Sequence, residues 1–507
     1  MKPKNRHCMS KRMFILAAML LFAFAAGAQP YSKVLKRNFW NDGENAVGIR
    51  QDSLSRSYAE IYGGYVTGGL RASFEATDAW NAGVRAATIM HLKKFSMTGS
   101  FGFEQMWGQG MAGSMFIRQG FYPINVYEFT PGPKTLQTYT FSGGISVDIA
   151  PNWRIGGRMD FESDNYAKRK DLRHMTYRLD MTVAPGVQYH DGKFAAGLNY
   201  IYSRNGETVK AEQVGSTVAA YTAFFDKGIY YGTEEIWTGS STHLDEVGVS
   251  GLPVHENIHG AAFQASYGDA YADIRWRHRS GEAGEKQTVW YRFPGWDLRS
   301  RMGLRLPGPR GAHVFHLAVD YLDQDNYETV LDKVTEGGVT TTVEYGSNLI
   351  FNRKNFNASL DYRFAAARWE FGGAFFLSDQ HAQSSVMYPY VGLQHLIMPG
   401  LQGSVVRRLG PVTASLSARW DQGAITDNLK TVDSGSGVQG APERLDRYFV
   451  KFKDHMTSYK LMLMPSLTYS FARGFYVDAS MRWQHGFNLV YLGNYRLSAM
   501  LRAGYNF

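Results

Sequence analysis

Residues 495–507 read YRLSAMLRAGYNF, and an apolar side chain occupies every second position from Tyr495 to Phe507. The intervening positions are mostly polar and include Arg496 and Arg502. Side chains on a β-strand point alternately to opposite faces, so this pattern predicts a strand with one apolar and one mostly polar face.

The same alternation recurs upstream in many segments of about ten residues, the length that a tilted membrane strand needs. The clearest segments are 139–149, 153–162, 355–364, 412–421 and 475–484. A soluble β-sandwich would also alternate. The number of segments favours instead an all-β, transmembrane, antiparallel outer-membrane β-barrel.

The N-terminal residues look like an export signal. Five basic residues lie in residues 1–12 (Lys2, Lys4, Arg6, Lys11 and Arg12), and an apolar run from Met13 to Ala26 leads to the small residues Ala26-Gly27-Ala28. This order predicts a cleaved secretory signal peptide over 1–28. Cleavage lowers the formal charge from +9 to +4 and removes Cys8, the single cysteine. A nucleic-acid partner and thiol chemistry are therefore not expected.

No later segment has eighteen consecutive apolar residues, which excludes a helical membrane span. Only a closed barrel then remains as a way to cross a membrane. Residues 57–507 are expected to form this barrel, while the polar residues 29–56 form a periplasmic tail or a small plug.

Connection lengths alternate between short and long. Short turns are expected at 93–94, 150–152, 190–192, 268–269, 307–309, 365–367, 409–411 and 472–474. Long connections are expected at 107–137, 205–257, 325–352 and 424–456. Short periplasmic turns and long external loops are typical of bacterial barrels, and the count is about 18 strands, within a range of 16–18. The strands near 60–75 and 394–408 have the weakest pattern.

Two features of the ends add to this picture. The final Phe507 resembles the terminal signal by which the barrel assembly machinery recognises its substrates. Aromatic residues next to the short turns predict an interfacial girdle, and they are Phe95, Trp153, Phe194, Trp369, Phe471, Phe475 and Phe507.

With the stretch 38–48 (NFWNDGENAVG) behind a signal peptide and before repeated strands, the chain resembles a Bacteroidota outer-membrane barrel family known only as a domain of unknown function. The resemblance covers nearly the whole mature chain. It implies a barrel, and it brings no substrate, cofactor or catalytic residue.

An arginine cluster is the strongest local feature. Strand alternation turns six arginines away from the apolar face of two successive strands, and they are Arg275, Arg277, Arg279, Arg299, Arg301 and Arg305. Strands joined by a hairpin are neighbours, so these side chains should line one wall of the lumen. They would favour anions if uncompensated. The alternative is pairing with carboxylates such as Asp320 and Asp361.

Three weaker motifs predict no chemistry. Gly108–Gly113 matches a dinucleotide fingerprint but lacks the required βαβ context. Ser241, His243 and Asp245 are too close in sequence for a preorganised triad. Asp323, Asp325 and Glu328 lack the glycine of a calcium loop.

We therefore expect a non-enzymatic barrel without cofactor or metal, located in the cell outer membrane and surrounded by its lipids. The first functional hypothesis is porin-like passage of a small solute, with an anion as one candidate, because barrels of this size can enclose water. The alternative is a structural or accessory barrel that docks onto another outer-membrane barrel or a lipoprotein. An aromatic-rich stretch, 221–237, would either fold inward or cover such a partner.

Overall fold

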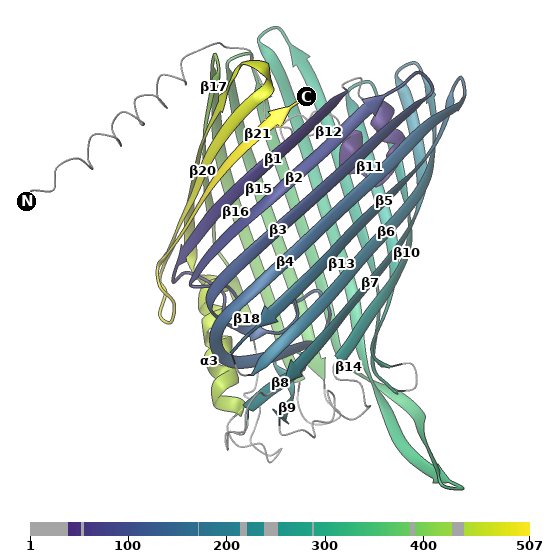
Figure 1. Cartoon of the computed structure of the whole chain (residues 1–507), viewed down its shortest axis with the longest axis vertical. Coiled ribbons are helices and arrows are strands. Elements are labelled where there is room, and N and C mark those ends of the chain that lie inside the picture. The colour runs from purple at the N-terminus through teal and green to yellow at the C-terminus, as the bar shows by residue number, and fades with distance from the viewer. Residues whose placement is uncertain are drawn as a thin grey trace, which may run out of the picture.

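The computed structural model describes residues 39–51, 55–170, 172–212, 221–237, 252–285, 288–385, 391–427 and 441–507. Eighteen antiparallel strands form a closed barrel, in which β21 pairs with β1 from Gly68↔Arg496 to Tyr58↔Asn506 (Figure 1). The predicted fold and strand count are confirmed. The expected signal peptide, residues 1–28, lies outside the described residues.

The wall consists of β1 (Arg56–Gly68), β2 (Asp78–His91), β3 (Phe95–Ser114), β4 (Asn125–Ala150), β5 (Trp153–Lys168), β6 (Arg173–Asp191), β7 (Phe194–Glu212), β10 (Leu252–Tyr267), β11 (Ala270–Glu285), β12 (Thr288–Gly308), β13 (Gly311–Glu336), β14 (Val339–Ala365), β15 (Trp369–Ser385), β16 (Val391–Leu409), β17 (Val412–Asp421), β19 (Tyr459–Ser470), β20 (Phe475–Phe487) and β21 (Tyr495–Asn506). Each wall strand pairs with its chain neighbours in the wall, so the order around the barrel follows the sequence.

Five further elements lie off this wall: η1 (Phe39–Asp42), η2 (Ala46–Gln51), β8 (Tyr221–Gly228), β9 (Tyr231–Trp237) and α3 (Ala441–Thr457). The short β18 (Ala424–Asp427) belongs to the wall, and the short η4 (Ala472–Gly474) forms one of the turns. The hairpin β8–β9 pairs with the start of β4, and β18 continues the line of β17 along β16. Among the helices that the structure describes, none is long and apolar enough to span a membrane.

The outer face of the wall is apolar, as the alternation predicts. Ile61, Trp80 and Leu501 are each about 60% exposed although they belong to regular strands. Trp153, Phe194, Trp369, Phe475 and Phe507 are exposed beside the short turns, where an interfacial girdle was expected. A wall of this kind is stable only in contact with lipid.

All the short turns lie at the end of the barrel that carries the C-terminus, and the longer connections lie at the other end (Figure 1). We call these the turn end and the loop end.

Some predicted boundaries are wrong. The first strand starts at Arg56 and stops at Gly68, whose φ of +126° ends the regular strand, rather than covering 60–75. The expected loop 325–352 is instead paired as an extension of β13 and β14 that projects from the loop end (Figure 1). The expected loop 424–456 contains α3, and the expected loop 107–137 is reduced to 115–124 because β3 and β4 extend further than predicted.

Candidate functional site

Residues 39–51, which we call the N-terminal segment, lie inside the barrel near the turn end (Figure 1). The Trp40 indole is buried and donates a hydrogen bond of 3.1 Å from Nε1 to Ser266 Oγ. Arg50 makes an ion pair of 2.7 Å with Asp148, and Arg158 Nη1 donates to the carbonyl of Gly43. The segment therefore has its own anchors on the inner wall.

Glycines on four adjacent strands form the seat of this segment: Gly144, Gly156, Gly186 and Gly197. At Gly156 an added Cβ would lie 3.1 Å from Val47 Cγ1, and at Gly186 it would overlap the Asn45 side chain. Asn45 Nδ2 also donates to Gln264 Oε1 over 3.0 Å. Only a wall without side chains leaves room for η2 here, so we name these four residues the glycine seat.

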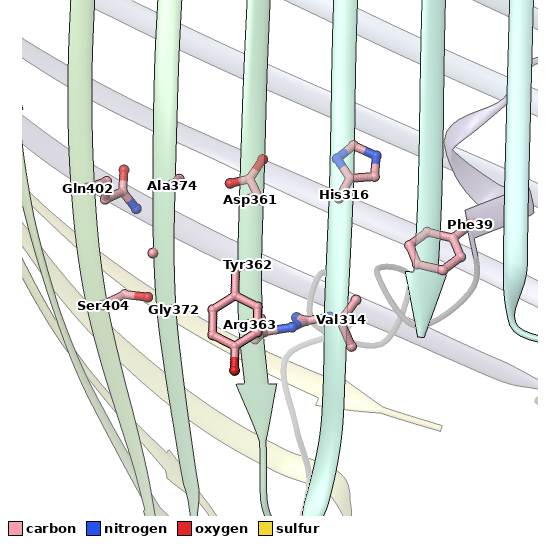
Figure 2. A pocket seen from close by; sticks show the side chains of 11 residues that line it. Phe39, Val314, His316, Asp361, Tyr362, Arg363, Gly372, Ala374, Gln402 and Ser404 are labelled. Atoms are coloured by element: carbon pink, nitrogen blue, oxygen red, sulfur yellow. The ribbon is translucent and has the colours of Figure 1, made fainter. Parts of the chain in front are cut away.

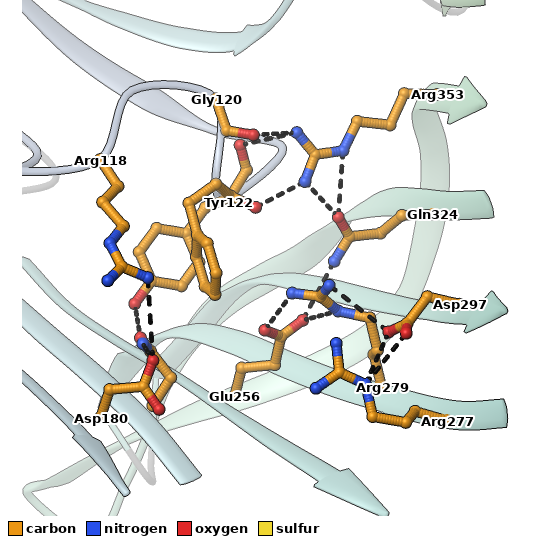
Figure 3. A network of polar contacts seen from close by, with 12 residues as sticks. Arg118, Gly120, Tyr122, Asp180, Glu256, Arg277, Arg279, Asp297, Gln324 and Arg353 are labelled. Carbon is orange, nitrogen blue, oxygen red and sulfur yellow. Dashed lines mark hydrogen bonds and ion pairs between the residues drawn. The ribbon is translucent and has the colours of Figure 1, made fainter. Parts of the chain in front are cut away.

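The arginine cluster surrounds a single carboxylate. Asp297 lies 2.9 Å from Arg277 Nε, 3.6 Å from Arg275 Nη2 and 3.7 Å from Arg279 Nη1. Arg279 also forms a two-pronged pair with the buried Glu256, at 2.9 and 2.6 Å (Figure 3). Asp297 thus lies within ion-pair distance of three arginines from β11 at once, and its single negative charge offsets one of their three positive charges.

The remaining arginines differ in their surroundings. Arg301 pairs with Asp320 over 2.7 Å, Arg299 faces Arg275 in register, and Arg305 is exposed close to the turn end. Arg275 pairs in addition with Glu44 of the N-terminal segment. The carboxylates near the cluster weaken the field that the arginine pattern alone would predict.

At the loop end, residues 115–124 fold into the barrel, and we call them the inserted loop. Arg353 of β14 donates hydrogen bonds to the carbonyls of Gly120, Phe121 and Tyr122 (Figure 3). Gln324 accepts from Arg353 Nε over 3.1 Å and holds the guanidinium in place. One buried arginine therefore fixes three consecutive carbonyls that no strand satisfies.

The inserted loop and the β8–β9 hairpin share a hydrophobic core with the inner wall. Its buried members include Met115, Phe116, Tyr122, Ile124, Val126, Leu172, Phe225, Leu252, Tyr291, Phe293 and Phe351. The rings of Phe225 and Tyr291 stack at 5.2 Å. The aromatic stretch 221–237 therefore folds inward at Phe224 and Phe225, which are almost completely buried.

The helix α3 packs against this cover at one side of the loop end (Figure 1). Tyr230 of the hairpin contacts Phe449 and Phe452 edge-on, and Tyr448 donates to the carbonyl of Glu128. Asp454 accepts hydrogen bonds from the amides of residues 490–492, between β20 and β21. Sequence reasoning missed this helix, although the apolar spacing of Tyr448, Phe449 and Phe452 is helical.

One buried acid in the cover titrates near neutrality. Asp226 lies in the β8–β9 hairpin, off the wall, and burial raises its pKa to about 7. Hydrogen bonds from backbone amides, including one of 2.9 Å from Gly228, oppose this rise without cancelling it.

A cavity of about 370 Å³ remains in the turn-end half of the lumen (Figure 2). Its lining comes from β13, β14, β15 and β16, and Phe39 of the N-terminal segment borders it. Of the charged residues at this cavity, Asp361 was expected only as a possible partner of the arginine cluster, and Arg363 was not predicted to belong to any site.

The weaker motifs show no catalytic or metal geometry. Gly108–Gly113 lies within β3 and its bulges, and Asp323 and Asp325 both accept from Asn352. In the described ranges no three histidine, cysteine, aspartate or glutamate side chains converge on a metal position. Ser241, His243 and Asp245 lie outside the ranges that the structure covers.

Together, the closed wall, its apolar outer face and the filled polar interior define a transmembrane β-barrel of the outer-membrane type. The chain belongs to a family of unknown function (DUF6850), whose model matches residues 46–507. The expected membership of a barrel family without known function is thereby confirmed, whereas its assignment to Bacteroidota remains a prediction. A comparison with curated proteins gives no match.

Solved structures of similar shape include several transporters. The FrpB iron transporter from Neisseria meningitidis is 9% identical, with a TM-score of 0.45, 91% of this chain and 83% of that chain covered. The copper transporter OprC is 6% identical (TM-score 0.39; 89% and 80% covered), and the transporter YddB from Escherichia coli is 7% identical (TM-score 0.39; 88% and 81%). Similarity at this level carries no argument about function.

Proposed function

We propose that this protein is a non-enzymatic outer-membrane barrel that is closed at rest and acts as a structural or accessory barrel for another outer-membrane barrel or a lipoprotein. The supporting observation is the cover of the loop end. A core of buried aromatic and aliphatic side chains joins the inserted loop to the wall, and opening it would expose this apolar surface to water.

Arg353 is the residue on which this closure most depends. Its side chain is buried, and its guanidinium donates hydrogen bonds to three backbone carbonyls of the inserted loop. Replacing it leaves those carbonyls without partners, at a cost of about 1–3 kcal/mol for each unsatisfied group.

Conductance in planar bilayers tests the proposal. The wild-type barrel should give almost no steady current, while Arg353→Gln should give frequent openings. Arg363→Gln is the matched control, because Arg363 lies on the same strand and faces the lumen but pairs with Glu370 rather than with the loop. Steady conductance of the wild type would overturn the closed barrel.

The second candidate is porin-like passage of a small solute. It is favoured by the polar lumen wall that contains Arg277, Arg299 and Arg301. Passage through this wall requires displacement of the inserted loop, so a wild-type barrel that conducts would support this candidate instead.

The proposed orientation places the loop end outside the cell. A cysteine at Thr335, near the tip of the β13–β14 hairpin, should then react with an impermeant maleimide on intact cells, and one at Arg473 should not. Reaction at Arg473 alone would invert the orientation.

A further inference from the structure

The cavity at the turn end has a regular construction. Its inward side chains form two rows across four strands: His316, Asp361, Ala374 and Gln402 in the first, and Val314, Arg363, Gly372 and Ser404 in the second. Within each row the residues are direct register partners. The small residues Ala374 and Gly372 share the third strand, β15, and leave a dent between polar neighbours (Figure 2).

The dent has the width of one small ring. Asp361 and Gln402 lie on strands two apart, so their backbones are separated by about 9.5 Å. A six-membered ring that carries hydroxyl groups can span this gap with hydrogen bonds of about 2.8 Å on both sides. The volume of about 370 Å³ likewise suits a single small molecule.

The polar groups around the dent define the chemistry. Asp361 can only accept hydrogen bonds, Arg363 can only donate them, and Gln402 and Ser404 can do both. The two charges are of opposite sign, and Arg363 is also 3.6 Å from Glu370. A ligand with hydroxyl groups that donate and accept matches this set better than an ion of either sign.

An aromatic ring completes one border of the cavity. Phe39 lies between His316 and Tyr271, with ring centroids at 6.2 and 6.1 Å and nearly parallel planes. It also packs against Gly303, where an added Cβ would lie 2.5 Å from the ring. The position of Phe39 is therefore well defined: both faces of its ring are covered by His316 and Tyr271, and the ring closes the cavity on the β12 side without reaching the dent on β15 (Figure 2).

From this lining we propose that the dent between Asp361, Arg363, Gln402 and Ser404 binds a small, neutral, polyhydroxylated solute of the size of one sugar ring. The site is independent of the proposed closure at the loop end, because it lies in the opposite half of the lumen. Binding in detergent solution does not depend on whether the barrel conducts.

Saturation-transfer NMR with glucose as the probe and the purified full chain tests this site. Wild type should show transfer to the sugar ring. Ala374→Leu fills the dent and should abolish the transfer, and Gln402→Ala should weaken binding by about tenfold through the loss of hydrogen bonds. Ala414→Leu, the same change on the lipid-facing side of β17, is the matched control and should bind as wild type does.

Two results would overturn the proposal: no transfer to glucose in the wild type, or equal transfer in Ala374→Leu. Saturation transfer to sodium glutamate in place of glucose would show that the solute class is wrong. Circular dichroism of each variant verifies that the β-barrel has formed, and Gln402→Ala, which only shortens a lumen side chain, keeps the test decisive if Ala374→Leu does not fold.

Discussion

The Asn45 side chain occupies the space above Gly186 where any other residue would place its Cβ. Asn45 is buried there, and its amide donates to Gln264, which in turn donates to Asn199 over 2.8 Å. Two features therefore define the seat of the N-terminal segment. Gly186 has no side chain to displace Asn45, and a chain of hydrogen bonds runs from Asn45 through Gln264 to Asn199 on two other strands.

Gly186→Val should displace the N-terminal segment, because the new side chain would overlap Asn45. Hydrogen exchange of residues 39–51 should become faster, whereas exchange in the wall strands should stay slow. Gly157→Val is the matched control: nothing lies within 4 Å of a Cβ added there, since Gly157 faces outward. Unchanged exchange in Gly186→Val would show that the glycine seat does not hold the segment.

Asp297→Asn should raise the net positive charge of the arginine cluster by one, since Asp297 is the carboxylate that contacts Arg275, Arg277 and Arg279 together. In a barrel opened by Arg353→Gln, the reversal potential in a salt gradient should shift toward anions. Arg277→Gln and Arg301→Gln should shift it in the opposite direction, because each removes one positive charge from the cluster. If Asp297→Asn leaves the reversal potential unchanged, the cluster does not control ion preference.

Low pH should favour the closed mouth. The pKa of Asp226 is raised to about 7 in the docked hairpin, so docking is most stable when the acid is protonated. Its contribution is complete below its ordinary pKa near 4 and is lost as pH rises through about 7. Hydrogen exchange of residues 223–230 should therefore be slower at about pH 5 than at about pH 8 after correction for intrinsic rates. Asp226→Asn should remove this difference; a difference that persists in the variant would assign it to another group.

Deletion of Phe507 should reduce assembly more than stability. Its ring is 71% exposed, and its amide donates one hydrogen bond of 2.9 Å to Ser57. Loss of that bond costs about 1 kcal/mol, which is little for a barrel closed by a full β1–β21 ladder. The yield of inserted protein in cells should fall, while the refolded barrel unfolds at nearly the wild-type urea concentration. Equal yields would exclude a signal role for Phe507.

The wall could be predicted from the sequence because strand alternation is local. The pattern of 495–507 and of segments such as 412–421 gives the face of each side chain directly, and lipid on one side enforces it. The inward direction of the arginine side chains rests on the same period. The alternation does not reveal their partners Glu44 and Glu256. Glu44 lies off the wall, and Glu256 lies on a strand whose register depends on the 205–257 connection.

The interior could not be predicted for the same physical reason. The inserted loop is held by Arg353, which lies more than 230 residues away in the sequence, and no periodicity reports such a contact. The cavity depends on the register between four strands. Ala374 contributes to it because its register partners on the two neighbouring strands are the polar residues Asp361 and Gln402. Only α3 had a usable local signal, in the spacing of its aromatic residues.

The hairpin β13–β14 has strand edges outside the membrane, and these edges are protected in a different way from the strand edges within the membrane. Among the described residues, 329–336 of β13 and 339–347 of β14 pair across the hairpin with each other, and neither stretch is in register with β12 or β15. Inside the membrane, closure of the ring removes such edges. Outside it, Asp332, Lys333 and two register shifts near 327 and 331 interrupt a surface on which a foreign strand could add, so the hairpin extends into solution without becoming a template for aggregation.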